Sequence, residues 1–190
     1  KIGNTPYVKE RQELGKRLFA DKNLSKSKTI ACQSCHQKDK AFSDQLQFSI
    51  SADGKSQLSR NSPSLNYSVY SEKFFHDLRA HDLNNQTEHV VMASNEFNTT
   101  YSEIISYLES IDEYKKAFSN AFPEYPKSIH KNTFTLAIKE YVASLPEHSS
   151  KFDIYVQNGE NDIPDDVRNG FNLFLGKAQC ATCHFPPTFS

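Results

Sequence analysis

The 190-residue sequence contains no tryptophan, and its aromatic residues are nine tyrosines and 14 phenylalanines, which we expect to pack mainly between helices. No apolar run approaches the roughly 18 residues that a membrane-spanning helix needs, so no membrane span is predicted. Charge of one sign is not in excess either, because 22 Lys and Arg face 23 Asp and Glu. That balance gives no reason to expect nucleic acid or an anionic membrane as a partner.

Cysteine is scarce as well, and all four cysteines lie in two C-x-x-C-H motifs, at residues 32–36 and 180–184. C-x-x-C-H is the attachment signature of a c-type haem, in which each thiol bonds one vinyl group and the histidine faces the iron. The motifs predict two covalently bound c-type haems. The expected haem-binding residues are Cys32, Cys35 and His36, and Cys180, Cys183 and His184, with each histidine as an iron ligand.

Other sites also use the C-x-x-C spacing. A zinc site, a thiol redox pair and a structural disulfide remain alternatives, but none of them requires a histidine directly after both pairs. Because covalent c-type haem is assembled outside the bacterial cytoplasm, we expect an exported, periplasmic protein, although no signal peptide is visible at Lys1. Only six residues follow His184, so we expect the second haem domain to be truncated.

Hydrophobic periodicity predicts a mainly α fold. The two haem motifs predict two tandem cytochrome c-like haem domains within it, the second one truncated. The expected helices cover residues 9–19, 83–92, 101–108, 112–118, 129–145, 151–156 and 165–175, with Thr99 or Thr100, Asp112 and Asp165 as caps. The polar stretch 38–72 lacks this periodicity, and beside a haem it is interpreted as a functional loop rather than a disordered linker.

The stretch 158–164 is rich in Gly, Asn and Asp and predicts a domain boundary. We therefore expect an N-terminal haem domain over residues 1–160 and the start of a C-terminal, electron-transferring cytochrome c domain over residues 161–190. The sequence ELGKRLF at 13–19 precedes the first motif, and RNGFNLF at 168–174 precedes the second. Their similarity indicates two related units in tandem, although no repeat of about 20 to 50 residues is present.

Taken in order, these features resemble the bacterial di-haem cytochrome c peroxidase and MauG family. The resemblance rests on LGKRLF (14–19), AFSD (41–44), RNSPSLN (60–66), FHDLRA (75–80) and both C-x-x-C-H motifs. It runs over nearly the whole chain, but it covers only the first part of a typical member. It implies a mainly α-helical protein with two haem domains.

The resemblance also implies a reaction. Hydrogen peroxide would be reduced to water at the N-terminal haem, with electrons passed from the C-terminal haem, which receives them from a small cytochrome c or a copper protein. A calcium ion commonly lies between the haems, and Asn61 is a candidate ligand, although an ordinary turn residue is the alternative. Many members pair, so a homodimer is one of the assemblies that the resemblance allows.

Register within the family selects three candidate catalytic residues. Glu96 follows Arg79 by 17 residues and matches the family's catalytic carboxylate, with Gln86 on the glutamine between them. Such a carboxylate would carry the proton from the bound peroxide oxygen to the leaving one. Gln86 would donate to the leaving oxygen, and Arg79 would do the same or bind a haem propionate. A solvated surface position is the alternative for Glu96.

The sequence departs from the family in two places. Residues 48–60 contain no histidine, whereas classical members carry one there that caps the resting iron. The first haem is therefore either open at rest or capped by His76, His81 or His89. The family's tryptophan between the haems would sit at His76.

These departures leave two other functions open. A MauG-like enzyme that oxidises a side chain of a partner protein is favoured by the missing histidine and disfavoured by the missing tryptophan. A non-catalytic di-haem electron carrier would instead have two six-coordinate irons that do not react with peroxide.

Overall fold

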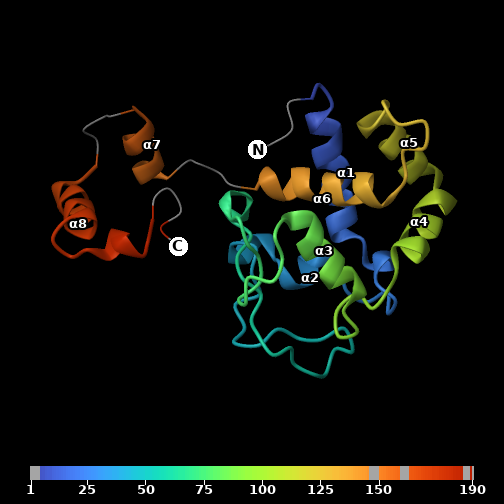
Figure 1. The fold of residues 1–190 in the computed structure, drawn as a ribbon, viewed down its shortest axis with the longest axis horizontal. Helices are drawn as coiled ribbons and strands as arrows, with labels where there is room; N and C mark the ends of the chain where they lie inside the picture. Colours follow the sequence, from blue (N-terminus) through green and yellow to red (C-terminus); the bar gives the residue numbers. More distant parts are fainter. Residues whose placement is uncertain (1–4, 146–149, 159–162, 186–188, 190) are drawn as a thin grey trace. The chain divides into compact units, whose positions relative to one another are not determined.

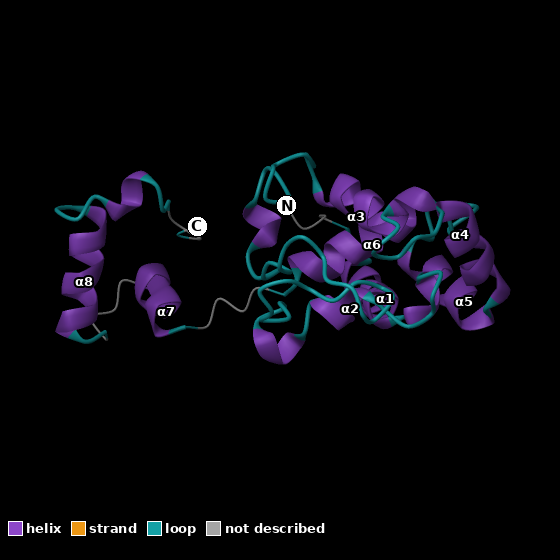
Figure 2. Cartoon of the chain, turned by 90° about the horizontal axis from the view of Figure 1, so that it is seen from below, coloured by secondary structure: helices purple, strands orange, loops and turns teal. Residues whose placement is uncertain are grey.

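The computed structural model describes residues 5–145, 150–158, 163–185 and 189. Within these ranges the secondary structure consists of α-helices and short 3₁₀ turns, and the only β pairing is in isolated bridges (Figure 2). The prediction of a mainly α fold is confirmed. No helix in the described part of the chain is long and apolar enough to cross a membrane.

Every predicted helix forms, with ends that differ from the prediction by a few residues. The α-helices are α1 (Val8–Ala20), α2 (Cys32–Cys35), α3 (Leu83–Met92), α4 (Tyr101–Ser110), α5 (Asp112–Ala121), α6 (Lys131–Ala143), α7 (Lys151–Asn158) and α8 (Asp165–Leu175). The chain divides into two compact units, residues 1–145 and residues 146–190.

The predicted cap of α4 is confirmed. The Thr100 hydroxyl accepts a hydrogen bond from the Glu103 amide at 3.2 Å, and the Glu103 carboxylate accepts one from the Thr100 amide at 2.8 Å. This reciprocal capping box satisfies two amides that the first turn of a helix otherwise leaves unpaired.

The predicted caps at Asp112 and Asp165 are wrong. Each is the first residue of its helix, α5 or α8, and neither of these helices has a side-chain cap. Their carboxylates instead pair with cations three residues later, Lys115 and Arg168. An acidic residue in the first turn still stabilises the helix, because it offsets the positive end of the helix dipole.

The core of the first unit forms where α1 crosses and packs against α6 (Figure 1). Leu14 and Leu18 of α1 are buried, four residues apart on one face of the helix. Gly15 lies between them and lets the two backbones approach closely: a Cβ added at Gly15 would lie 2.0 Å from the Ala137 carbonyl oxygen. A side chain at this position is therefore incompatible with the observed spacing of the two helices.

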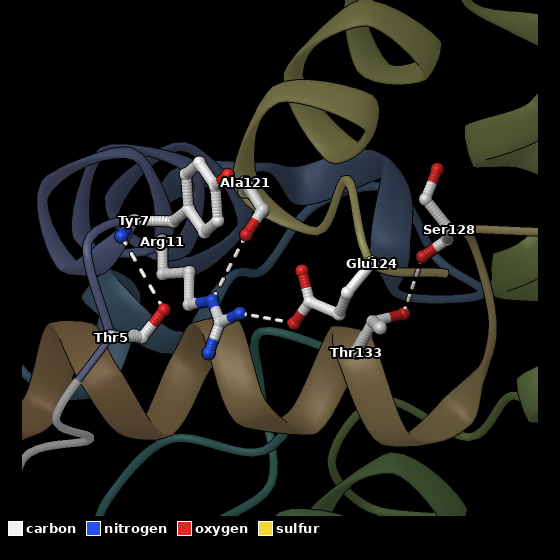
Figure 3. Close-up of polar contacts among 7 residues, drawn as sticks. All are labelled: Thr5, Tyr7, Arg11, Ala121, Glu124, Ser128 and Thr133. Atoms are coloured by element: carbon white, nitrogen blue, oxygen red, sulfur yellow. Dashed lines mark hydrogen bonds and ion pairs between the residues drawn. The ribbon is translucent and has the colours of Figure 1, made fainter. Parts of the chain in front are cut away.

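Arg11 joins α1 to the end of α5 although it is buried, with 6% of its surface exposed. Its Nε donates to the Ala121 carbonyl at 2.9 Å, and its guanidinium pairs with the carboxylate of Glu124 (Figure 3). The guanidinium also lies over the Phe122 ring, 4.5 Å from the centroid. A buried charge is tolerated here because all three contacts replace the water that it loses.

We expect Arg11→Ala to lower the free energy of unfolding by about 2–3 kcal/mol, because the buried Ala121 carbonyl would lose its partner. Thermal unfolding followed by circular dichroism measures this loss. Lys115→Ala is the matched control, since it removes an exposed ion pair to Asp112 that is worth about 0.5 kcal/mol or less. Equal effects in the two variants would contradict the role given to Arg11.

The second unit is held by aromatic rings. Phe152 of α7 packs edge-to-face on Phe171 of α8, with 4.9 Å between ring centroids, and Phe189 contacts both rings. Because of this cluster, α7 belongs to the second unit, and the division into compact units falls before α7. The domain boundary predicted after residue 160 lies on the C-terminal side of α7 in the sequence, and it stays a prediction.

Candidate haem-binding and catalytic site

The first C-x-x-C-H motif forms one helical turn followed by its histidine. The two cysteines begin and end α2, and the His36 amide donates to the Cys32 carbonyl at 2.9 Å. The turn starts in a fixed orientation because the Ala31 amide donates to the Ser34 hydroxyl at 3.0 Å. Both thiols are free and half-buried. One turn therefore presents two thiols and an imidazole together.

The His36 imidazole has a defined tautomer. Its Nδ1 lies 2.9 Å from the Phe42 carbonyl oxygen, and because a carbonyl only accepts, Nδ1 carries the proton. Burial lowers the pKa of His36, which favours the neutral ring. With the proton on Nδ1, Nε2 carries the lone pair that a metal would take, and this is the arrangement in which a histidine ligand is oriented through its other nitrogen. A second backbone carbonyl, that of Pro63, also lies by the ring and opposes the lowering of its pKa.

The Phe42 carbonyl is held in place by a tight turn. Ala41 and Phe42 both adopt left-handed backbone conformations, with φ of 54° and 55°, which are costly for residues other than glycine. The Phe42 amide donates to the Gln37 carbonyl at 2.8 Å, and Gln37 pairs with Ser43 in an antiparallel bridge. The start of the polar stretch 38–72 is therefore held by hydrogen bonds and orients His36, and its role as a functional loop stays a prediction.

The second motif forms a 3₁₀ turn, Cys180–Thr182, but its histidine makes the same two hydrogen bonds as His36. The His184 amide donates to the Cys180 carbonyl at 2.9 Å. The His184 Nδ1 donates to the Phe189 carbonyl at 3.1 Å, so its Nε2 carries the lone pair in the same way. Two loops of different sequence thus give the two histidines the same tautomer.

A phenylalanine lies beside each histidine. The Phe19 ring at the end of α1 is 6.3 Å from the His36 ring, and the Phe174 ring in α8 is 6.3 Å from the His184 ring. These phenylalanines occupy matching positions in the two similar heptapeptides, ELGKRLF and RNGFNLF. The internal similarity predicted from the sequence therefore has a structural counterpart at both motifs.

The residues present fit a covalently bound haem. Burial raises the pKa of Cys32 to about 12 and that of Cys35 to about 11, so both side chains are neutral thiols in this structure. Across the described ranges, no group of three or more His, Cys, Asp and Glu side chains is arranged to hold a metal ion. Two free thiols and a neutral imidazole are the groups that a c-type haem requires.

Glu96 lies near the first motif, in the turn that follows α3. Its amide donates to the Ala93 carbonyl at 3.0 Å, and the next residue, Phe97, is buried. Burial raises the pKa of the Glu96 carboxyl to about 7. Burial is the main cause of the raised pKa of Cys32 and Cys35, and the negative charge of Glu96 adds to it for both thiols, so this carboxyl lies near the turn of the first C-x-x-C-H motif.

Arg79 carries the positive charge that acts on Glu96 and partly offsets the rise of its pKa. Its guanidinium is exposed, pairs with both oxygens of Asp77 at 2.9 and 3.0 Å, and lies 3.5 Å from the centroid of the Phe75 ring. Gln86 is half-buried on α3, the helix that leads into the Glu96 turn. The charge of Arg79 thus acts on the carboxyl of Glu96. The catalytic roles of Glu96, Arg79 and Gln86 stay predictions.

The remaining predicted residues lie at the surface. Asn61 is exposed, and its role as a calcium ligand stays a prediction. The candidate capping histidines His76, His81 and His89 are exposed too. His89 packs edge-on against Phe75, with 5.6 Å between ring centroids. Capping of the first haem by one of them also stays a prediction.

Sequence reasoning missed the groups that orient the histidines. Phe42 was noted only as part of the AFSD motif, and its contribution is a backbone carbonyl, for which no side-chain pattern exists. Phe19 and Phe174 could be paired from the sequence, because both end one of the two similar heptapeptides. Their contact with the histidines can be seen only in the folded chain.

The sequence profile described as "Di-haem cytochrome c peroxidase" matches residues 9–161. The chain belongs to the di-haem cytochrome c peroxidase and MauG family. Over 179 residues it is 32% identical to cytochrome c551 peroxidase of Pseudomonas aeruginosa, an alignment that covers 94% of this chain and 51% of that protein. It is 30% identical over 183 residues to the methylamine utilization protein MauG of Methylophilus methylotrophus, covering 95% of this chain and 54% of that protein.

A solved structure agrees with this assignment. The crystal structure of a MauG-like protein associated with microbial copper homeostasis matches with a TM-score of 0.82 and 30% identity, over 92% of this chain and 51% of that one. The chain thus spans about half the length of the relatives it matches. The family implies c-type haems, in agreement with the two motifs.

Proposed function

We propose that this chain forms the peroxide-reducing part of a di-haem peroxidase, in which Glu96 is the acid and base. The observation that carries the proposal is the position of this half-buried carboxyl near the turn of Cys32 and Cys35, with a pKa raised to about 7. A group with a pKa close to neutral can both accept and return a proton at physiological pH.

The protein groups have separate roles in this proposal. Cys32 and Cys35 would attach the haem, and the Nε2 atom of His36 would bind its iron. The haem would supply the iron that binds hydrogen peroxide and the electrons that reduce it to water. Glu96 would accept a proton from one peroxide oxygen and return it to the other. The positive charge of Arg79 favours the ionised form of Glu96, which is the form that accepts the proton.

The proposal includes a source of electrons. A small cytochrome c or a copper protein would reduce the haem bound at His184, and electrons would pass from there to the haem bound at His36. The relatives named cytochrome c551 peroxidase support a cytochrome as the electron donor. Export to the periplasm, two haems, a calcium ion at Asn61 and a homodimer belong to the same proposal.

A donor-oxidation assay tests the proposal. The full-length, haem-loaded protein is mixed with ferrocytochrome c, and hydrogen peroxide is then added. We expect donor oxidation that depends on both the protein and peroxide. A protein that leaves the donor reduced, with a Soret band that peroxide does not shift, would be an electron carrier and the proposal would be wrong.

A MauG-like function is the second candidate, because residues 48–60 lack a histidine and the MauG-like structure matches with a TM-score of 0.82. Such an enzyme would oxidise a side chain of a partner protein. The same assay separates the two: a Soret shift with peroxide but without donor turnover favours the MauG-like reaction.

The pH dependence of the peroxide reaction should follow Glu96. Because only the ionised carboxylate accepts a proton, we expect the rate constant to rise with pH through a midpoint near 7. The free energy of unfolding should change with pH in the opposite direction to the rate. The folded chain favours the protonated carboxyl, so the contribution of Glu96 to the free energy of unfolding falls as pH rises from 4.5 to about 7. Stopped-flow absorbance measures the kinetic profile, and a flat profile in the wild type would contradict the assignment.

A further inference from the structure

The Glu96 turn is fastened to a loop more than forty residues earlier in the chain. The carbonyl oxygen of Asn95, directly before Glu96, accepts two hydrogen bonds from that loop: one from the Ser51 hydroxyl at 2.9 Å and one from the Ala52 amide at 3.0 Å. Both lone pairs of this oxygen are therefore used. Ser51 is buried, with 6% of its surface exposed, so water competes little for its hydroxyl.

The loop that supplies these donors has its own internal support. Ile50 and Gln57 form an antiparallel bridge, and the Ser51 amide donates to the Ser56 carbonyl at 2.8 Å. At the tip, the Asp53 carboxylate accepts hydrogen bonds from two backbone amides and from the Ser56 hydroxyl. These internal hydrogen bonds stabilise the conformation of the loop, so it can hold the Glu96 turn in a fixed position.

The other side of the turn is fixed as well. The Lys26 amide donates to the Phe97 carbonyl at 2.9 Å, and the Phe97 amide donates to the Val90 carbonyl of α3 at 3.3 Å. The residues directly before and after Glu96 are thus both bound through their carbonyls to distant segments. The Ser51 bond is the one among these that depends on a side chain, so it can be removed by substitution.

We propose that Ser51 is a positioning residue for Glu96, which holds the carboxyl in register with the haem-attachment turn through the Asn95 carbonyl. The inference rests on the proposed function of Glu96. It assigns a role to the stretch 48–60, which lacks the histidine found there in classical members: in this chain the stretch orients the acid/base residue. The rate of proton transfer depends steeply on the distance and orientation of the two groups, so a small displacement of the carboxyl has a large effect on the rate.

The test compares Ser51→Ala with Ser56→Ala in the full-length, haem-loaded protein. Each variant removes one serine hydroxyl from the same loop, but of the two hydroxyls only that of Ser51 bonds the Glu96 turn. In Ser56→Ala the Asp53 carboxylate keeps its two backbone amides, so the loop stays closed. The first readout is hydrogen exchange by mass spectrometry over residues 93–99. The second is the rate constant for reaction with hydrogen peroxide, and the third is the KM for the electron donor. Thermal unfolding confirms that both variants are folded.

We expect Ser51→Ala to speed exchange in residues 93–99 and to slow the peroxide reaction by about 10- to 100-fold, with the donor KM unchanged. Ser56→Ala should leave all three close to wild type. The proposal would be overturned if Ser51→Ala exchanged residues 93–99 at the wild-type rate. It would also be overturned if Ser51→Ala reacted with peroxide as fast as Ser56→Ala does. If the wild type itself does not react with peroxide, the proposed function fails, and the exchange comparison alone decides whether Ser51 fixes the turn.

Discussion

Replacement of Glu96 by glutamine is expected to lower the rate of peroxide reduction by about 10²- to 10⁴-fold, the usual contribution of a positioned acid/base. Glutamine keeps the size and a hydrogen-bonding oxygen of the side chain, but it cannot accept and return a proton. The haem-attachment residues are untouched, so the Soret spectrum of the resting protein should stay unchanged. Steady-state oxidation of ferrocytochrome c, together with stopped-flow mixing with peroxide, measures the loss.

Glu113→Gln is the matched control for this variant. Glu113 is an exposed residue in the first turn of α5, so its substitution removes the same charge without touching the site. We expect it to react with peroxide like the wild type. The pH dependence near 7 should also disappear in Glu96→Gln and persist in Glu113→Gln. A Glu96→Gln variant that keeps full activity would show that another group moves the proton.

Gly15→Ala is expected to be the most damaging single-methyl substitution in the first unit. The added Cβ would lie 2.0 Å from the Ala137 carbonyl oxygen and 2.7 Å from Tyr141 Cβ, so α1 and α6 would have to separate. Such overpacking costs about 1–3 kcal/mol or more, which exceeds the gain of about 1 kcal/mol that alanine brings within a helix. We expect a fall of several degrees in the thermal midpoint, measured by far-ultraviolet circular dichroism.

Gly170→Ala makes the same change at the matching position of α8. No described atom outside its immediate neighbours lies within 4 Å of a Cβ added there, so we expect no loss of stability and a small gain from helix propensity. A Gly15→Ala variant as stable as the wild type would mean that α1 and α6 can move apart at little cost. Because Phe19 ends α1 beside His36, the Soret spectrum of Gly15→Ala also reports on that movement.

Periodic apolar residues were sufficient to predict the helices, because burial of one face decides where a helix forms. Leu14 and Leu18 gave α1 in this way. The roles of Asp112 and Asp165 were less well predicted, because an aspartate favours both the cap and the first turn. Only the preceding backbone distinguishes the two positions, and a single sequence does not contain that information.

The candidate site was predictable to the extent that its chemistry lies in side chains. The C-x-x-C-H motifs selected the candidate haem-binding residues, and register within the family selected Glu96 as the candidate acid/base. Arg11 and Ser51 gave no signal, because their partners are backbone carbonyls far along the chain: Ala121 is 110 residues from Arg11, and Asn95 is 44 residues from Ser51. Such contacts depend on the whole fold, and a charged residue or one serine among many looks like surface.

The contact between Arg11 and Ala121 also sets an order of events during biosynthesis. Loop closure over 110 residues cannot occur until α5 has been synthesised, and the packing of α1 on α6 must wait longer still. Cys32 and Cys35 emerge early, while this part of the chain is still open, and the finished fold half-buries their thiols. The interval before closure is therefore when both thiols are most accessible to a partner that modifies them.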